Sequence, residues 1–259
     1  MSDTISTFRN GDLLEVMTTA MKFMAKPNPL FSDSVLQNMW LNFDGEFLHV
    51  HSTNEGTFFT HRLWTLSHKA PAWPTPILLA HMDVLDFVNL LKRKGKKDHV
   101  ELAVTEDVRY LNVDLCSLPL LQTRRDEFVA NSVIESYEGL HFNVIDDPYY
   151  YDSKITCRGL PLCSLKTYKQ FLEIIKAFSG LPDVSVRRGR MRLGDSSKKP
   201  SIFEKPGHVS DLPYWDFSAA DSFNARRIIW MALKSDPEGP PKKEIDTSWM
   251  SEPKMQRTK

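Results

Sequence analysis

The sequence has few of the residues that build disulfide, zinc or phosphate-binding frameworks. It contains 3 cysteines and 11 glycines in 259 residues. An odd number of cysteines without Cys-x-x-Cys spacing disfavours a disulfide framework and leaves a zinc site without its ligand pairs. The glycines form no loop that could cradle a phosphate, and no serine lies in a nucleophile-elbow motif. We therefore expect no cofactor and no enzymatic activity.

Long apolar runs and an excess of one charge are also missing. No stretch approaches the ~18 uncharged apolar residues that a membrane span needs. The first residues lack the basic and then apolar order of a signal peptide. We expect a cytoplasmic protein without membrane contact, in the bacterial host cytoplasm if a phage encodes it. Lys+Arg and Asp+Glu both number 33, so any attraction to nucleic acid must come from the distribution of the charges.

What the sequence does contain is a repeated order of short blocks. Residues 43–50 read FDGEFLHV and residues 137–144 read YEGLHFNV. Residues 87–92 read FVNLLK and residues 171–176 read FLEIIK, and each is followed by a turn and a short apolar strand. An internal repeat determines the architecture, so this order predicts two related units. Chance matching of short apolar strings is the alternative.

Apolar periodicity predicts a mixture of helices and strands. Asn10 is a plausible N-cap of the first helix. Helices are expected at 11–25, 83–94, 165–178 and 219–234. Strands are expected at 36–43, 46–52, 57–63, 77–80, 99–104 and 108–114, and near 131–136, 140–145 and 154–158. A strand pair at 184–187 and 190–193 would turn at Arg188-Gly189.

This order of elements resembles a DNA sliding-clamp domain used in tandem. The blocks FDGEFLHV and DVLDFVNLLKRK carry the resemblance. It implies an α+β fold of two tandem clamp-like domains, with antiparallel sheets backed by helices. The domains would cover 1–118 and, in diverged form, 119–234, followed by a flexible tail at 235–259. The resemblance also implies a homo-oligomeric ring trimer on duplex DNA and a DNA polymerase as the protein partner.

A ring needs cations that offset phosphate charge rather than groups that recognise bases. Basic residues follow helix 83–94, lie on helix 165–178 and alternate along the 184–193 strand pair. The expected DNA-binding residues are Lys92, Arg93, Lys94, Lys96, Lys97, Lys166, Lys169, Arg187, Arg188 and Arg190. Two other interpretations stay open: cations at a helix C-terminus also offset the helix dipole, and the arginines could simply be solvated.

Helix 11–25 disfavours closure of a ring around DNA, because it is rich in methionine and offers only Lys22 and Lys26. The alternative function is a monomeric clamp-fold adaptor, such as a phage factor that binds a site-specific (serine) recombinase and controls its directionality. Helix 219–234 would then bind the protein partner. The expected partner-binding residues are Phe223, Arg226, Arg227 and Trp230, for which core packing is the other interpretation.

Three histidines are the remaining candidates for chemistry. His49 and His51 fall on one face of an expected strand, and His61 lies on the next strand. Three imidazoles can bind zinc, but no carboxylate or cysteine is placed to complete the set. Histidines that face solvent on a sheet are the ordinary interpretation, so we expect no metal site.

Overall fold

The computed structural model describes a large part of the chain. The described residues are 4–27, 35–54, 56–67, 71–124, 149–151, 165–179, 181, 183–193, 210–221 and 224–230. The strands expected near 131–136, 140–145 and 154–158, Phe223, and the tail at 235–259 lie outside them.

Residues 4–119, which we call the first unit, contain the same order of elements twice: a strand, a helix and a three-stranded meander. The first set is β1 (Thr4–Arg9), α1 (Asn10–Lys22), η2 (Val35–Gln37), β2 (Asn38–Phe43), β3 (Phe47–Asn54) and β4 (Thr57–Trp64). The second set is β5 (Ile77–Ala80), α2 (His81–Lys92), β6 (His99–Val104), β7 (Tyr110–Val113) and β8 (Cys116–Pro119). Each set lends its first strand to the other: β1 pairs with β6, and β5 pairs with β2.

Residues 149–230, which we call the second unit, continue the sheet of the first. After α3 (Leu121–Arg124), their elements are β9 (Tyr149–Tyr151), α5 (Leu165–Ala177), β10 (Ser185–Leu193), β11 (Ser210–Ala220) and β12 (Ala225–Trp230). The strand order β9-β10-β11-β12 corresponds to the order β1-β6-β7-β8 of the four-stranded sheet in the first unit. Antiparallel pairing of β12 with β4 creates an eight-stranded sheet, β5-β2-β3-β4-β12-β11-β10-β9. The expected α+β class with antiparallel sheets is confirmed, whereas the division at residue 118 stays a prediction.

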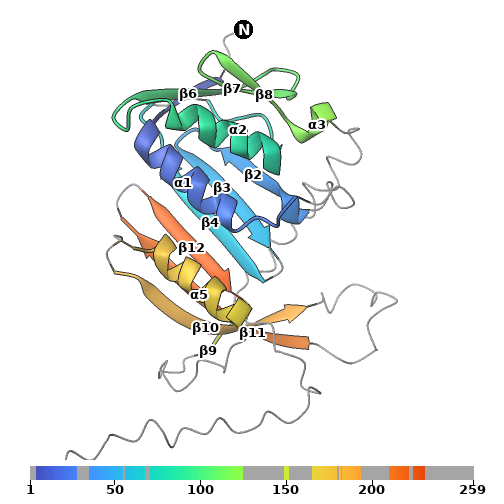
Figure 1. The fold of residues 1–259 in the computed structure, drawn as a ribbon, viewed down its shortest axis with the longest axis vertical. Coiled ribbons are helices and arrows are strands. Elements are labelled where there is room, and N and C mark those ends of the chain that lie inside the picture. The colour runs from blue at the N-terminus through green and yellow to red at the C-terminus, as the bar shows by residue number, and fades with distance from the viewer. Residues whose placement is uncertain are drawn as a thin grey trace, which may run out of the picture.

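The helices α2, α1 and α5 lie on one side of the eight-stranded sheet (Figure 1). Alternation along the strands turns residues such as Val50, Phe59 and Ile228 toward them, and these side chains are almost fully buried. Helix α5 packs onto the strands of the second unit through Phe171, whose ring centre is 6.3 Å from that of Phe217 on β11. The opposite faces of the helices are left for solvent. In the described part of the chain, no helix has both the length and the apolar character needed to cross a membrane.

Asn10 does not cap its own helix, so the predicted N-cap is wrong. Arg9 occupies the N-cap position and makes no side-chain cap hydrogen bond. Asn10 is fully buried, and its Nδ2 donates to the carbonyls of Leu91, Lys94 and Gly95 at 3.0, 3.3 and 3.1 Å. These carbonyls lie at the C-terminal end of α2, where helix carbonyls lack hydrogen-bond donors, so the Asn10 side chain supplies donors to the neighbouring helix.

Two predicted elements of the second unit are also wrong. The region expected to be helix 219–234 is the end of β11, a turn and all of β12, as far as residue 230. The expected turn at Arg188-Gly189 is absent, because β10 runs unbroken from Ser185 to Leu193 and pairs with β11 along its whole length. Both segments, ARRIIW and SVRRGRMRL, lack the regular alternation of apolar and polar residues by which half-buried strands are recognised in a sequence.

Candidate functional site

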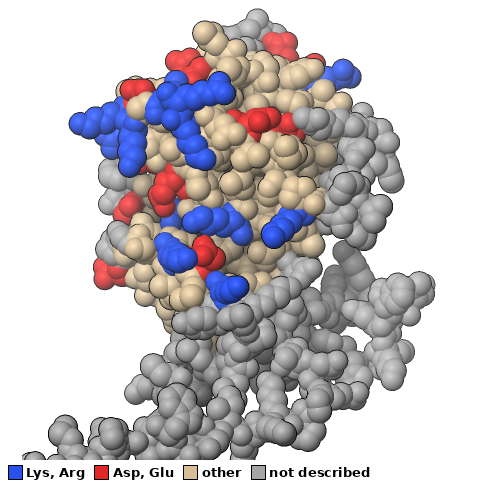
Figure 2. All heavy atoms as spheres, in the orientation of Figure 1, with Lys and Arg blue, Asp and Glu red and all other residues tan. Residues whose placement is uncertain are grey.

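The expected DNA-binding cations after α2 lie in the turn that leads to β6. Helix α2 ends at Lys92, and four of the cations are exposed: Lys92, Arg93, Lys96 and Lys97. Lys94 differs, because its Nζ lies 2.6 Å from Asp114 Oδ2 and donates to the His99 carbonyl at 2.9 Å. Figure 2 shows Lys and Arg side chains gathered at this end of α2. The turn therefore carries a concentrated positive charge, to which Lys94 contributes least.

The start of α1 holds this turn in place. The Gly11 N–H donates to the Lys96 carbonyl at 3.0 Å, and the Asn10 N–H donates to the Asp98 carbonyl at 2.8 Å. A Cβ at position 11 would lie 2.9 Å from the Lys96 oxygen. Only glycine allows this close approach of the two backbones. The cations are thus presented by a turn that is fixed between two helices.

The cations of α5 share the helix side of the sheet with acidic groups. Lys169 and Lys176 are exposed, and Lys176 Nζ lies 2.8 Å from Glu173 Oε1. Lys22 of α1 lies 3.9 Å from the other oxygen of Glu173. The hydrogen bond from Lys176 is the main cause that lowers the pKa of Glu173. Positive charge is therefore partly offset at α5, as it is at Lys94 in the turn after α2.

Four of the expected DNA-binding residues can be placed only by their backbone. Lys166 is in the first turn of α5, and Arg187, Arg188 and Arg190 are in β10. Their contact with DNA stays a prediction.

Arg226 joins the two units from within the protein. It lies on β12, is 2% exposed and points to the helix side of the sheet. Its Nη2 donates to Glu15 Oε1 of α1 at 2.8 Å, its Nη1 donates to the Ala177 carbonyl at the end of α5, and its Nε donates to His61 Nδ1 at 3.3 Å. One guanidinium therefore contacts both units through three different acceptors.

His61 is a neutral acceptor in this network. Burial, and secondly the charge of Arg226, lower its pKa from 6.5 to about 3. His61 pairs with Val50 and so faces the opposite side of the sheet from His49 and His51. The zinc hypothesis is thus wrong in its geometry, and His51 and His61 are buried rather than facing solvent. Within the described residues, no group of three or more His, Cys, Asp or Glu could hold a metal ion.

The low pKa of His61 predicts that stability falls in mild acid. Between pH 6.5 and 3 the unfolded chain binds a proton that the folded chain does not bind. The free energy of unfolding therefore decreases as pH falls, by about 1.4 kcal/mol per unit from this group. The variant His61→Gln retains an acceptor for Arg226 but cannot titrate. Urea unfolding at pH 7 and pH 5 should show it losing about 2 kcal/mol less than the unmodified protein, and equal losses would contradict the role of His61.

The other expected partner-binding residues are divided between the two faces of β12. Trp230 is completely buried, and its ring centre lies 5.7 Å from that of Phe171. Arg227 donates to buried Asp216 on the outer side, with two contacts of 3.0 Å. Arg226 and Trp230 thus occupy the interior, which corresponds to the core-packing interpretation.

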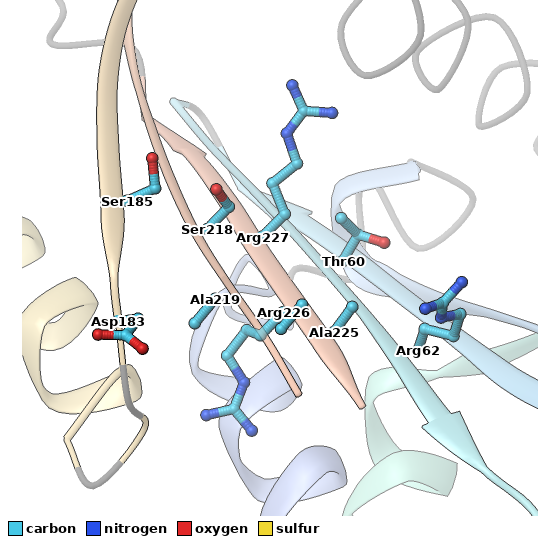
Figure 3. A pocket seen from close by; sticks show the side chains of 10 residues that line it. Thr60, Arg62, Asp183, Ser185, Ser218, Ala219, Ala225, Arg226 and Arg227 are labelled. Atoms are coloured by element: carbon cyan, nitrogen blue, oxygen red, sulfur yellow. The ribbon is translucent and has the colours of Figure 1, made fainter. Parts of the chain in front are cut away.

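An open hollow of about 440 Å³ lies on the outer side of the sheet, where β4 and β12 join the units. Its lining comes from four strands and from Asp183, which precedes β10. The strand residues are Thr60 and Arg62, Ser185, Ser218 to Ala220, and Ala225 to Arg227. Figure 3 shows Arg226 and Arg227 leaving β12 in opposite directions. No local motif signals this site, because strand pairing brings together segments that are up to about 167 residues apart.

Comparison with protein-family models and with curated proteins finds no match. Among solved structures, the chain is similar to DNA polymerase III subunit β from Borrelia burgdorferi, at 12% identity and a TM-score of 0.45 over 93% of this chain and 68% of that one. It is also similar to the sliding clamp from Pseudomonas aeruginosa, at 9% and 0.44 over 91% and 67%. Proliferating cellular nuclear antigen from Entamoeba histolytica matches at 8% and 0.43, over 89% and 99%.

These matches agree with the resemblance to sliding clamps that the sequence suggested. At such identities the likeness concerns the fold alone. The chain spans about two thirds of the two bacterial subunits and nearly all of the antigen.

Proposed function

We propose that this chain is a non-enzymatic, sliding-clamp-like protein that supports DNA replication or another DNA transaction. The helix side of the eight-stranded sheet would face the duplex. The exposed turn after α2 carries the proposal, because within the described residues none of its four exposed cations forms an ion pair: Lys92, Arg93, Lys96 and Lys97.

The amount of charge favours phosphate over helix stabilisation as the purpose of this turn. The C-terminus of a helix carries roughly half a negative charge, which a single cation offsets. Four exposed cations exceed that need several-fold. They would attract phosphates without recognising bases. Acidic residues on the same side, such as Asp12 and Asp86, would keep the contact weak, which suits a protein that moves along DNA.

The proposal predicts a change in salt dependence. A variant with Lys92→Gln, Arg93→Gln, Lys96→Gln and Lys97→Gln should bind a labelled duplex more weakly. The slope of log affinity against log salt should become shallower by about 3.6, since each of the four lost phosphate contacts contributes about 0.9. Fluorescence anisotropy between about 50 and 200 mM salt measures this slope.

The matched control is Arg62→Gln, which removes an exposed arginine from the outer side of the sheet. Its slope should equal that of the unmodified protein. Equal slopes for the quadruple variant and the control would reject the turn as a DNA contact.

A second experiment, retention on closed circular and on linear duplex, separates a ring from a monomeric adaptor. A ring would be retained on closed circular duplex in high salt and lost after linearisation, whereas an adaptor would dissociate from both. The mixture of charges on α1 and α5 and the net charge of zero are the observations that support the adaptor as the alternative function. A DNA polymerase and a recombinase both stay predictions for the protein partner.

A further inference from the structure

Leu115 is the most exposed of the large apolar side chains in the described part of the chain, with a relative exposure of 102%. It lies with Asp114 in the turn between β7 and β8, whose flanking residues Val113 and Cys116 are paired. A polar residue would suit a solvated turn better. Because the leucine adds nothing to the core, its place in the turn has no explanation in the stability of the fold.

Asp114 fixes the conformation of this turn. Its φ of 52° lies in the left-handed region, which aspartate tolerates better than most residues. Its N–H donates to the Glu101 carbonyl at 2.9 Å, and its Oδ1 accepts the Glu101 N–H at 3.0 Å. Its other carboxylate oxygen lies 2.6 Å from Lys94 Nζ. Leu115 is therefore presented by a turn that is already ordered, so less conformational entropy is lost when it contacts a ligand.

The contact with Lys94 places Leu115 beside the exposed cations of the turn after α2. Lys94 lies between Arg93 and Lys96 in the sequence, and both of these are exposed. Proteins that kink DNA combine the same two features. Their cations hold phosphates, which carry no sequence information, and an apolar side chain such as leucine enters between two base steps.

A lipid surface is the other ligand that takes cations and apolar groups together. Stable attachment to a membrane requires the apolar face of a helix or an acyl chain in addition to charge. Leu115 has only Asp114 and Cys116 beside it in the chain, and they add no comparable apolar surface. Burial of one leucine stabilises by about 1.5–3 kcal/mol, which is similar to the few kcal/mol that unstacking of one base step costs. The arrangement therefore favours DNA.

We propose that Leu115 is a wedge that enters duplex DNA at a step where stacking is weak, while the turn after α2 holds the neighbouring phosphates. This inference rests on the proposed function, because the cations would bring the leucine to the duplex. It adds the class of DNA that is preferred. Unstacking costs least at a mismatched base, so the leucine should select a duplex with a mismatch over one that is fully paired.

The test uses two labelled duplexes that are identical except for one central mismatch. Fluorescence anisotropy should show the unmodified protein binding the mismatched duplex about tenfold more tightly, because the mismatch lowers the cost of unstacking. Leu115→Ser should bind the two duplexes equally, whereas Leu115→Met retains an apolar side chain and should keep the preference. Energy transfer between dyes at the two ends of the mismatched duplex should increase on binding, because a wedge kinks DNA by about 20–90°. Leu115→Ser should abolish that increase.

The matched control is Leu66→Ser, which removes a 44% exposed leucine that follows β4. It should keep the preference for the mismatch. Both leucines are exposed, so their variants should fold, as circular dichroism would verify.

Two outcomes would overturn the wedge alone: equal affinity of the unmodified protein for the two duplexes, or an unchanged preference in Leu115→Ser. The proposed function would survive either of them if the salt slope still responded to the quadruple variant. A slope that does not respond, or no binding to either duplex, would reject both proposals. Sedimentation with vesicles of phosphatidylserine and phosphatidylcholine that depends on Leu115, together with equal affinity for the duplexes, would assign the leucine to lipid and also overturn the wedge.

Discussion

Replacing Arg226 with methionine should lower the free energy of unfolding by about 3 kcal/mol. Methionine fills a similar volume but donates no hydrogen bond. The Ala177 carbonyl at the end of α5 and Nδ1 of His61 would lose their donor in a buried setting. Each buried group left without its partner costs about 1–3 kcal/mol. The loss should loosen α5 first, because Arg226 ties it to the first unit.

Glu15→Gln is the matched control for Arg226→Met. The Glu15 side chain is 60% exposed, so water replaces its ion pair and the expected cost is below about 1 kcal/mol. Urea unfolding measures both variants, and hydrogen exchange of α5 shows where the loosening begins. Similar costs for the two variants would mean that the ion pair, and not the buried hydrogen bonds, joins the units.

Replacing Trp230 with alanine should cost about 4 kcal/mol of unfolding free energy. The side chain is completely buried beneath Phe171, and truncation of a buried tryptophan leaves a cavity. The control is Ile175→Ala on α5, the helix that carries Phe171. The isoleucine is 48% exposed, which predicts a cost of below about 1 kcal/mol. The partner-groove interpretation predicts the opposite outcome, in which Trp230→Ala remains stable and loses only a binding partner.

The sequence predicts best those elements that have one buried face and one exposed face. Helices α1, α2 and α5 and strands β3, β4, β6 and β7 were expected within a few residues, since apolar side chains recur along them at a regular period. Strands β2 and β5 were also expected, although most of their residues are buried. In β4, for instance, buried Phe59, His61 and Leu63 alternate with more exposed residues. The correspondence between α2 and α5, suggested by FVNLLK and FLEIIK, also agrees with the strands that follow each helix, which are β6-β7-β8 and β10-β11-β12.

Elements whose neighbours come from far along the chain were missed. Strand β12 reads ARRIIW, and alternation along the strand turns its two arginines to opposite faces. Arg227 binds Asp216, whereas Arg226 binds Glu15 and the end of α5. Neither partner is close to β12 in the sequence, so the spacing of Phe223 and Trp230 was interpreted as one face of a helix. Strand β1 was missed because its ladder partner, β6, lies about 95 residues away.

The candidate site shows the same division between local and distant information. The cluster after α2 is contiguous, so the sequence alone indicates it. The pairing of Lys94 with Asp114 could not be read in this way, because it depends on how β7 turns back toward the helix. The hollow between Arg62 and Asp183 exists only after four strands have assembled.

The exchange of first strands between the two sets of the first unit has a consequence for synthesis on the ribosome. Thr4–Arg9 emerges early, and its ladder partner in the described part of the chain is His99–Val104. Nearly a hundred residues must therefore be translated before that ladder can close. Until then its N–H and C=O groups remain available to other nascent strands. Each set depends on a strand of the other, so neither can complete its sheet alone. The first 119 residues must therefore assemble together.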